Sequence, residues 1–120
     1  MTQGEIFNKH LEDVIDACVK ADLNRIFTQR VKVKEAPNYF EIIKDPIDLA
    51  MMKGKAKRRA YLDLPMFKAD ITLLRVNSEL YNGPAHIVTT FARNIEKTAL
   101  DNIQSRNLHN FELSIWFGLQ

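Results

Sequence analysis

Apolar residues recur every three or four positions through the first part of the chain. They are Phe7, Leu11, Val14, Ile15, Cys18, Val19, Ile26 and Phe27. This spacing places them along one stripe of a helix, and the strict alternation that a strand needs is absent. The pattern predicts an amphipathic helix over residues 5–27, with Cys18 in the core.

The helical pattern stops over residues 28–47. Lysine alternates with valine at Val31 and Val33, and Asp45 precedes Pro46, which favours extended or turn backbone. The alternation suits a short strand, but no other segment offers a partner for it, so the all-α class is favoured. A connection this long is unusual inside a compact domain, and it is usually functional where it occurs.

Three further helices are marked by their ends. Asp48 and Asp63 are good N-terminal caps, and Pro65 stands in a first turn, where proline is tolerated. Gly83 followed by proline is a strong helix stop. The expected helices cover residues 48–60, residues 63–82, and a stretch that starts near His86 or Ile87 and carries Val88, Phe91, Ile95, Ala99 and Ile103. With the first helix they predict an all-α four-helix bundle with one long connection.

The chain length of 120 residues suits a single domain. We expect a helical module over residues 5–104 and a helical C-terminal extension over residues 105–120. The extension keeps helical spacing through Leu108, Phe111, Ile115, Trp116 and Leu119. It either packs against the bundle, which we favour, or forms an exposed interface in a larger assembly.

Several classes of chemistry lack the residues that they need. Cys18 is the single cysteine, so neither an internal disulfide nor a thiolate metal cluster is expected. The expected compartment is a reducing one. His10, His86 and His109 do not have the spacing of metal ligands. No nucleophile with a base, carboxylate pair or phosphate loop is recognisable, which predicts a protein without cofactor that is not an enzyme. Neither a membrane-spanning stretch nor a signal peptide is expected.

The chain contains one dense basic run, which comprises Lys53, Lys55, Lys57, Arg58 and Arg59. The net charge of +2 is too small to indicate a nucleic-acid partner by itself. We favour a solvated face of the second helix. The alternative is a weak contact with nucleic-acid phosphates or a role in nuclear import, although no aromatic residues are interleaved for base stacking.

Two motifs resemble the signature of the bromodomain family. The first has a tyrosine, apolar residues, a lysine, and then proline, an apolar residue, aspartate and another apolar residue: Tyr39-Phe40-Glu41-Ile42-Ile43-Lys44-Asp45-Pro46-Ile47-Asp48-Leu49. The second has an asparagine and then a tyrosine–asparagine pair: Asn77-Ser78-Glu79-Leu80-Tyr81-Asn82. Their order and spacing match the family, and the two together are specific. The resemblance covers roughly residues 5–103.

The resemblance implies a left-handed bundle of helices Z, A, B and C. A long ZA loop and a short BC loop would form a pocket at one end of the bundle. Helix Z falls near residues 5–27, the ZA loop near 28–47, helix A near 48–60, helix B near 63–82, and helix C begins at about residue 87. These bounds agree with those read from periodicity and capping.

The resemblance also implies an acetyl-lysine site. Asn82 matches the asparagine whose amide donates to the acetyl carbonyl, and Tyr39 matches the tyrosine that reaches the same oxygen through a water. Tyr81 matches the aromatic wall, and Val88 stands at the gatekeeper position that opens helix C. Asn77 is expected to hold loop backbone in place.

The apolar part of the implied site shows departures from the family pattern. Phe27 and Val31 match the shelf and wall at the start of the ZA loop, but Arg25-Ile26-Phe27 stands where tryptophan-proline-phenylalanine is common. Ala36 lies where a larger aliphatic residue often sits, so a wider pocket is expected on the loop side. Gly83-Pro84 makes the BC loop unusual.

Acetylation turns the lysine ammonium into a neutral amide, which an apolar slot accepts while it penalises an unpaired charge. The resemblance therefore implies a nuclear, chromatin-associated reader of acetylated histone or other protein tails. We expect modest affinity, and small-molecule mimics of acetyl-lysine would occupy the same pocket. The alternative is a helical interaction module whose pocket is degenerate and which binds partners through its surface or tail.

Overall fold

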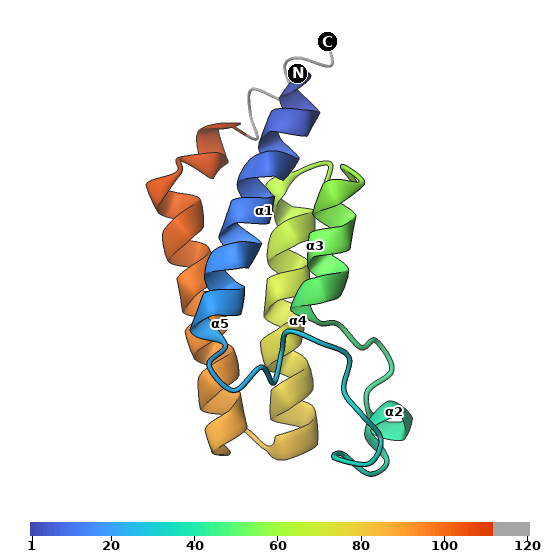
Figure 1. The fold of residues 1–120 in the computed structure, drawn as a ribbon. Helices are drawn as coiled ribbons and strands as arrows, with labels where there is room; N and C mark the ends of the chain where they lie inside the picture. The colour runs from blue at the N-terminus through green and yellow to red at the C-terminus, as the bar shows by residue number, and fades with distance from the viewer. Residues whose placement is uncertain (112–120) are drawn as a thin grey trace.

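The computed structural model describes residues 1–111 as a bundle of long helices. Its helices are α1 (Gln3–Ala21), α2 (Tyr39–Ile42), α3 (Leu49–Lys57), α4 (Leu64–Asn82) and α5 (Ile87–Ser105). Four of them form the bundle, whereas the short α2 lies to one side within the long connection between α1 and α3 (Figure 1). Residues 1–111 contain no strand, so the all-α prediction is confirmed and the alternation at Val31 and Val33 forms none.

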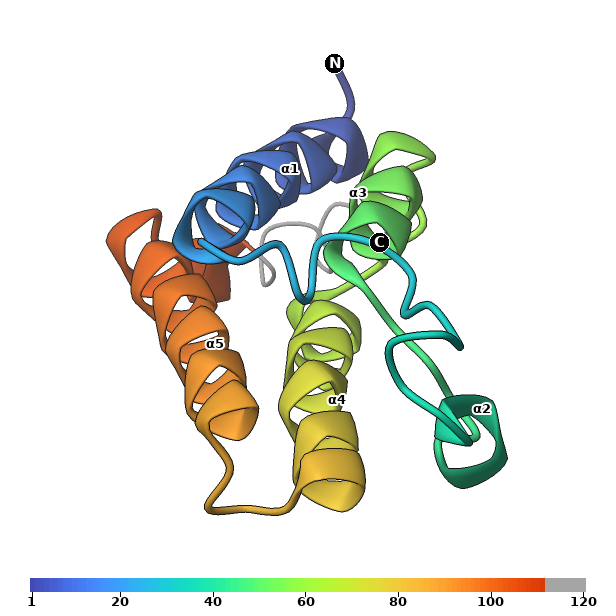
Figure 2. The same ribbon diagram turned by 60° about the horizontal axis from the view of Figure 1, so that its bottom comes forward.

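The bundle is held by the apolar stripes that the periodicity predicted. α1 packs against α3 and α5, and α4 packs against α5, so the core lies along the bundle axis (Figure 2). The fully buried side chains include Phe7, Leu11, Ile15, Phe67 and Ile95. Removing one such side chain from water contributes about 1.5–3 kcal/mol, so the four stripes together supply the main force for folding.

Cys18 lies in this core, as the sequence predicted. Its side chain is fully buried, and its thiol contacts the backbone carbonyl of Ile95 at 3.7 Å. Burial raises the pKa of the Cys18 thiol to about 12. Since the thiolate is the reactive form, this residue acts as a small apolar side chain.

Capping residues fix where the helices begin. The Asp48 carboxylate accepts from the amide of Met51 at 2.7 Å, and the Asp63 carboxylate accepts from the amide of Met66 at 2.9 Å. Each bond satisfies an amide that has no partner within its helix. The predicted starts of α3 and α4 are thereby confirmed, as is the end of α4 before Gly83.

The prediction that the first helix reaches Phe27 is wrong, because α1 ends at Ala21. The buried carboxylate of Asp22 accepts hydrogen bonds from the amide of Ile26 at 3.0 Å and the amide of Phe27 at 2.8 Å. It also accepts from the hydroxyl of Thr28 at 2.7 Å. These bonds hold the chain in a tight turn, and Ile26 and Phe27 keep apolar contacts with the core although they are no longer helical.

The second helix also ends earlier than predicted, at Lys57 rather than at residue 60. Arg59 follows with a left-handed backbone, φ 59°, and the chain then turns towards α4. Asn8 of α1 secures this turn, because its amide donates to the carbonyl of Tyr61 at 2.9 Å and its oxygen accepts from the amide of Tyr61 at 3.3 Å.

Most of the basic run is neutralised within the fold. Lys53 pairs with Asp16 at 2.5 Å, and Lys55 pairs with Asp70 at 2.7 Å. Arg59 lies 3.4 Å from a carboxylate oxygen of Glu5. The prediction was a solvated face of the second helix, and the structure adds that three of its five cations pair with carboxylates.

The chain folds back against α1 after α5. Residues 108–111 are helical, Leu108 is fully buried, and the Phe111 ring stacks on Phe7 with centroids 5.7 Å apart. This part of the predicted extension therefore packs on the bundle. Ile115, Trp116 and Leu119, which continue the same spacing, lie outside the described residues.

Two kinds of element are absent from residues 1–111. No helix there combines the length and the apolar character needed to cross a membrane. No cluster of three or more histidine, cysteine, aspartate or glutamate side chains in the same residues is arranged to hold a metal ion.

The turn after α1 generates a stability prediction. Asp22→Ala removes the acceptor of three hydrogen bonds and leaves the amides of Ile26 and Phe27 without their hydrogen-bond acceptor. The free energy of unfolding should therefore fall by about 2–4 kcal/mol. Asp22→Asn keeps one acceptor oxygen and should lose less. Chemical denaturation of the three proteins measures the difference. A loss below about 0.5 kcal/mol for Asp22→Ala would contradict the role given to this carboxylate.

Candidate functional site: a recess at one end of the bundle

The long connection and the link between α4 and α5 lie at the same end of the bundle, away from the N-terminus (Figures 1 and 2). The connection begins with the turn that Asp22 stabilises, and backbone hydrogen bonds then join it to α3. The carbonyl of Phe27 accepts from the amide of Leu49 at 2.8 Å, and the carbonyl of Thr28 accepts from the amide of Ala50 at 3.0 Å. These bonds place the Phe27 side chain at the inner edge of the connection.

Helix α4 holds the second half of the connection. The Asn77 amide donates to the carbonyl of Asp45 at 2.9 Å, and the Tyr81 hydroxyl donates to the carbonyl of Pro37 at 2.9 Å. The predicted role of Asn77 in holding loop backbone is therefore confirmed. Both carbonyls belong to irregular backbone with no helical partner, so these side chains give the loop a fixed distance from the bundle.

A recess of about 410 Å³ opens between the connection, the end of α4 and the start of α5. It gathers six of the seven residues that the sequence predicted for the site, from three separate parts of the chain. They are Val31, Ala36, Tyr39, Tyr81, Asn82 and Val88.

A smaller pouch of about 50 Å³ lies below the recess. The seventh predicted residue, Phe27, lines this pouch, together with Val31, Tyr39, Asn82 and Val88, which the two spaces share. The pouch is large enough for ordered water, and Asn77 and Ser78 add polar groups to its walls. The predicted residues therefore line two adjoining spaces, in whose shared walls apolar side chains stand beside Asn82 and Tyr39.

Tyr39 stands at the N-terminus of α2, directly after Asn38, whose backbone is left-handed with φ 61°. The Tyr39 ring is only 9% exposed and meets the Tyr81 ring edge-on, with centroids 5.0 Å apart. Burial, and secondarily the nearby Tyr81, raises the pKa of the Tyr39 phenol. The hydroxyl therefore keeps its proton throughout the neutral range and can donate a hydrogen bond in the recess.

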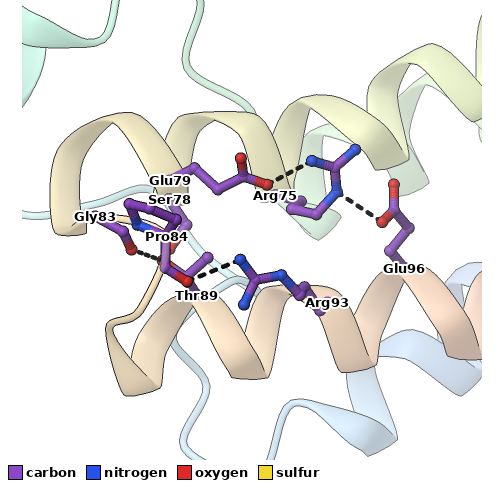
Figure 3. Close-up of polar contacts among 8 residues, drawn as sticks. All are labelled: Arg75, Ser78, Glu79, Gly83, Pro84, Thr89, Arg93 and Glu96. Carbon is purple, nitrogen blue, oxygen red and sulfur yellow. Dashed lines mark hydrogen bonds and ion pairs between the residues drawn. The ribbon is translucent and has the colours of Figure 1, made fainter.

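The Asn82 side chain is partly buried at the C-terminal end of α4. Its amide nitrogen donates to the Ser78 hydroxyl at 3.1 Å, and that hydroxyl lies 2.9 Å from the hydroxyl of Thr89 on α5. The Thr89 hydroxyl donates to the carbonyl of Gly83 at 2.8 Å. Figure 3 shows Ser78, Thr89 and Gly83 gathered where α4 and α5 approach each other.

The link between α4 and α5 is fixed by similar contacts. Gly83 has φ 97°, a conformation that favours glycine, and Arg93 donates to the carbonyl of Pro84 at 2.8 Å (Figure 3). The His86 ring caps α5, because its Nδ1 accepts from the amide of Val88 at 3.0 Å. His86 does not line the recess or the pouch, and it is exposed.

Sequence reasoning did not select several residues that line the site. Ile26 lines both the recess and the pouch, so the segment Arg25-Ile26-Phe27, which departs from the family pattern, still supplies apolar surface to the site. Ser78 and Gln29 were also missed. A signal existed for Ser78, because it stands four residues before Asn82 on one helix and therefore on the same face.

The chain resembles known proteins in both sequence and structure. The bromodomain family model matches residues 11–94. Transcription initiation factor TFIID subunit 1b of Arabidopsis thaliana is 38% identical over 74 residues, which are 60% of this chain and 4% of that protein. Bromodomain-containing protein 9 of Xenopus tropicalis is 34% identical over 88 residues, 73% of this chain and 15% of that protein. The chain thus spans a small part of these relatives.

A solved structure has the same helical arrangement. The crystal structure of CpBRD2 from cryptosporidium superposes with a TM-score of 0.77 at 30% sequence identity, covering 82% of this chain and 92% of that one. The family model covers more than half of the chain, and the helical bundle matches the fold of this solved structure. The chain belongs to the bromodomain family.

Proposed function

We propose that the recess binds acetylated lysine side chains on histone or other protein tails. The observation that carries the proposal is the meeting of Asn82 and Tyr39 in the wall that the recess and the pouch share. Val31 and Val88 also line both spaces and give that wall an apolar surface. Bromodomains are binding modules that generally read acetyl-lysine, which supports the proposal.

The chemistry of the recess suits a neutral amide that carries a methyl group. Val31, Tyr81 and Val88 offer apolar surface to the methyl group and the lysine stem. Within residues 1–111 the Asn82 amide makes one hydrogen bond, to Ser78, so its second N–H is available for an acetyl carbonyl. Such a bond contributes about 0.5–1.5 kcal/mol net, whereas leaving a buried carbonyl unpaired costs about 1–3 kcal/mol.

An unmodified lysine would place an ammonium in the same recess. Desolvation of an unpaired charge costs far more than desolvation of an amide, and no carboxylate lines the pouch to offset it. Discrimination therefore comes mainly from desolvation, and the hydrogen bond to Asn82 sets the orientation of the acetyl group. A water in the pouch, held by the Tyr39 hydroxyl, supplies the carbonyl with a second bond.

The proposed setting is a nuclear one, in chromatin-associated transcription. Similarity to a transcription initiation factor subunit supports this setting. The chain acts there by binding, without catalysis, and small acetyl-lysine mimics would compete for the recess. The alternative function is a helical interaction module that binds partners elsewhere on its surface. Titration with an acetylated peptide and its unmodified counterpart separates the two functions.

Asn82→Ala should weaken binding of an acetylated lysine peptide at least tenfold. The substitution removes the amide whose second N–H is the proposed donor to the acetyl carbonyl, and about 1.4 kcal/mol corresponds to a factor of ten. Calorimetric titration of the acetylated and unmodified forms of one peptide measures the effect.

A matched control for this experiment is Asn94→Ala, which removes an exposed amide of α5 outside the recess. It should bind like the parent protein. Equal binding of the acetylated and unmodified peptides, or undiminished binding by Asn82→Ala, would exclude the acetyl-lysine reader and favour the surface-binding alternative.

Tyr39→Phe should weaken binding of the acetylated peptide roughly two- to tenfold with little change in stability. The ring contact with Tyr81 is kept, whereas the hydroxyl that orients the bridging water is lost. Affinity and thermal midpoint measured on the same samples separate the two effects. A variant with parental affinity would show that the water-mediated bond plays no part.

A further inference from the structure

The charges around the recess are mostly positive. Three cations, Arg25, Arg30 and Lys32, line it together with a single carboxylate, Glu35. All four side chains are exposed, so they lie at the mouth rather than in the floor. Three positive charges less one negative charge leave an excess of two positive charges where the parts of a peptide on either side of an inserted lysine would pass.

These cations differ from several on the helices of the bundle, which are paired. Away from the recess, Lys53, Lys55 and Arg75 pair with carboxylates of neighbouring helices. Among residues 1–111, Arg25, Arg30 and Lys32 form no ion pair. Arg30 instead lies over the Phe40 ring, 4.6 Å from its centroid, a contact that leaves its charge uncompensated.

We propose that this module selects acetylated lysines that have aspartate or glutamate within about three residues of them. The inference rests on the proposed function and adds a preference for the flanking sequence. An extended peptide advances about 3.3–3.6 Å per residue, so side chains up to three positions away stay within the ~10 Å screening length at 0.1 M salt.

The same charges disfavour two competing ligands. An unmodified lysine would bring a fourth cation to a mouth that already holds three, which adds to the desolvation cost in the recess. A peptide rich in lysine and arginine around the acetylated residue, such as a histone tail acetylated at one position, would meet repulsion on both sides. Acetylation of neighbouring lysines would relieve that repulsion.

The test compares three peptides with one acetylated lysine and acidic, neutral or basic flanks, each with its unmodified counterpart. With two acidic residues, binding should be roughly three- to tenfold tighter than with neutral flanks, and basic flanks should weaken it. The difference should narrow between 0.01 M and 0.1 M salt, because the screening length falls from about 30 Å to about 10 Å.

Charge variants assign the preference to the mouth. Arg25→Gln combined with Lys32→Gln should remove most of the difference between acidic and neutral flanks. Lys9→Gln is the matched control, since Lys9 is exposed on the N-terminal half of α1 and forms no ion pair in the described part of the chain. It should leave the difference unchanged.

Three outcomes overturn the inference. The first is equal affinity for all three acetylated peptides, and the second is a preference that survives loss of Arg25 and Lys32. The third is displacement of the acidic peptide by a short oligothymidylate that binds more tightly, which would make the mouth a nucleic-acid contact. Failure of every acetylated peptide to bind better than its unmodified form would instead count against the proposed function.

A second inference comes from the hydroxyl chain, by which we mean Ser78, Thr89 and the carbonyl of Gly83. A carbonyl only accepts, so the single hydroxyl proton of Thr89 is committed to Gly83, 2.8 Å away. Thr89 must therefore accept from Ser78 at 2.9 Å, which commits the Ser78 proton as well. Ser78 can then only accept from Asn82, and the atom of Asn82 that faces it must be the amide nitrogen, at 3.1 Å.

The geometry points to Thr89 as a positioning residue for the proposed site. Thr89 is fully buried and lines neither the recess nor the pouch, yet its one proton decides which end of the Asn82 amide faces Ser78. With the amide reversed, Ser78 would donate to the Asn82 oxygen and the bond between the two hydroxyls would be lost. The observed orientation makes three bonds instead of two, so it fixes the position from which the second N–H of Asn82 can donate to an acetyl carbonyl.

Thr89→Val keeps the side-chain volume and removes the proton, so the Ser78 hydroxyl gains by donating to the Asn82 oxygen. Affinity for an acetylated peptide should fall roughly three- to thirtyfold. Thr89→Ser restores the hydroxyl and should bind within about twofold of the parent. In an Asn82→Ala background, Thr89→Val should have no further effect, whereas a general loss of structure would still weaken binding.

A ligand-free measurement keeps this second inference separate from the proposed function. The side-chain amide resonances of Asn82 should move in Thr89→Val and remain near their parental positions in Thr89→Ser. Ser78→Ala, which interrupts the hydroxyl chain at another point, should also move them. Unmoved resonances in both disruptive variants, or equal affinities for the valine and serine variants, would overturn the inference.

Discussion

The end of this bundle that holds the recess depends on one buried carboxylate, that of Asp22. It ends α1 and gathers two backbone amides and a hydroxyl, which turns the chain across the end of the bundle. Because of this turn, Ile26 and Phe27 face the recess and pouch, and the carbonyls of Phe27 and Thr28 reach the first amides of α3. A helix that continued past Ala21 would carry these side chains away from the site.

The four main helices could be predicted because their signals are local. Caps such as Asp48 and Asp63 bond to amides three residues later, and apolar stripes repeat within each helix. The end of α1 could not be predicted, since Ile26 continues the helical spacing while Asp22 makes its bonds through a turn. The short α2 was missed as well, because four residues are too few for periodicity and its start depends on the left-handed Asn38.

The candidate site was predictable from motif spacing, whereas the contacts that support it were not. Asn82 and Tyr39 were selected by resemblance, and all seven selected residues line the recess, the adjoining pouch or both. Ile26 was read as a departure from the family, although it supplies apolar surface to both spaces. Ser78 and Thr89 depend on how α4 and α5 meet, which no single stretch of sequence records.

The return of the chain after α5 has a consequence for longer proteins. Phe111, the last described residue, stacks on Phe7 near the start of α1, so both ends of the described chain lie at the pole opposite the recess (Figure 1). A chain segment that continues from either end of residues 1–111 starts at that pole. The recess therefore faces away from the pole where the chain enters and leaves this module.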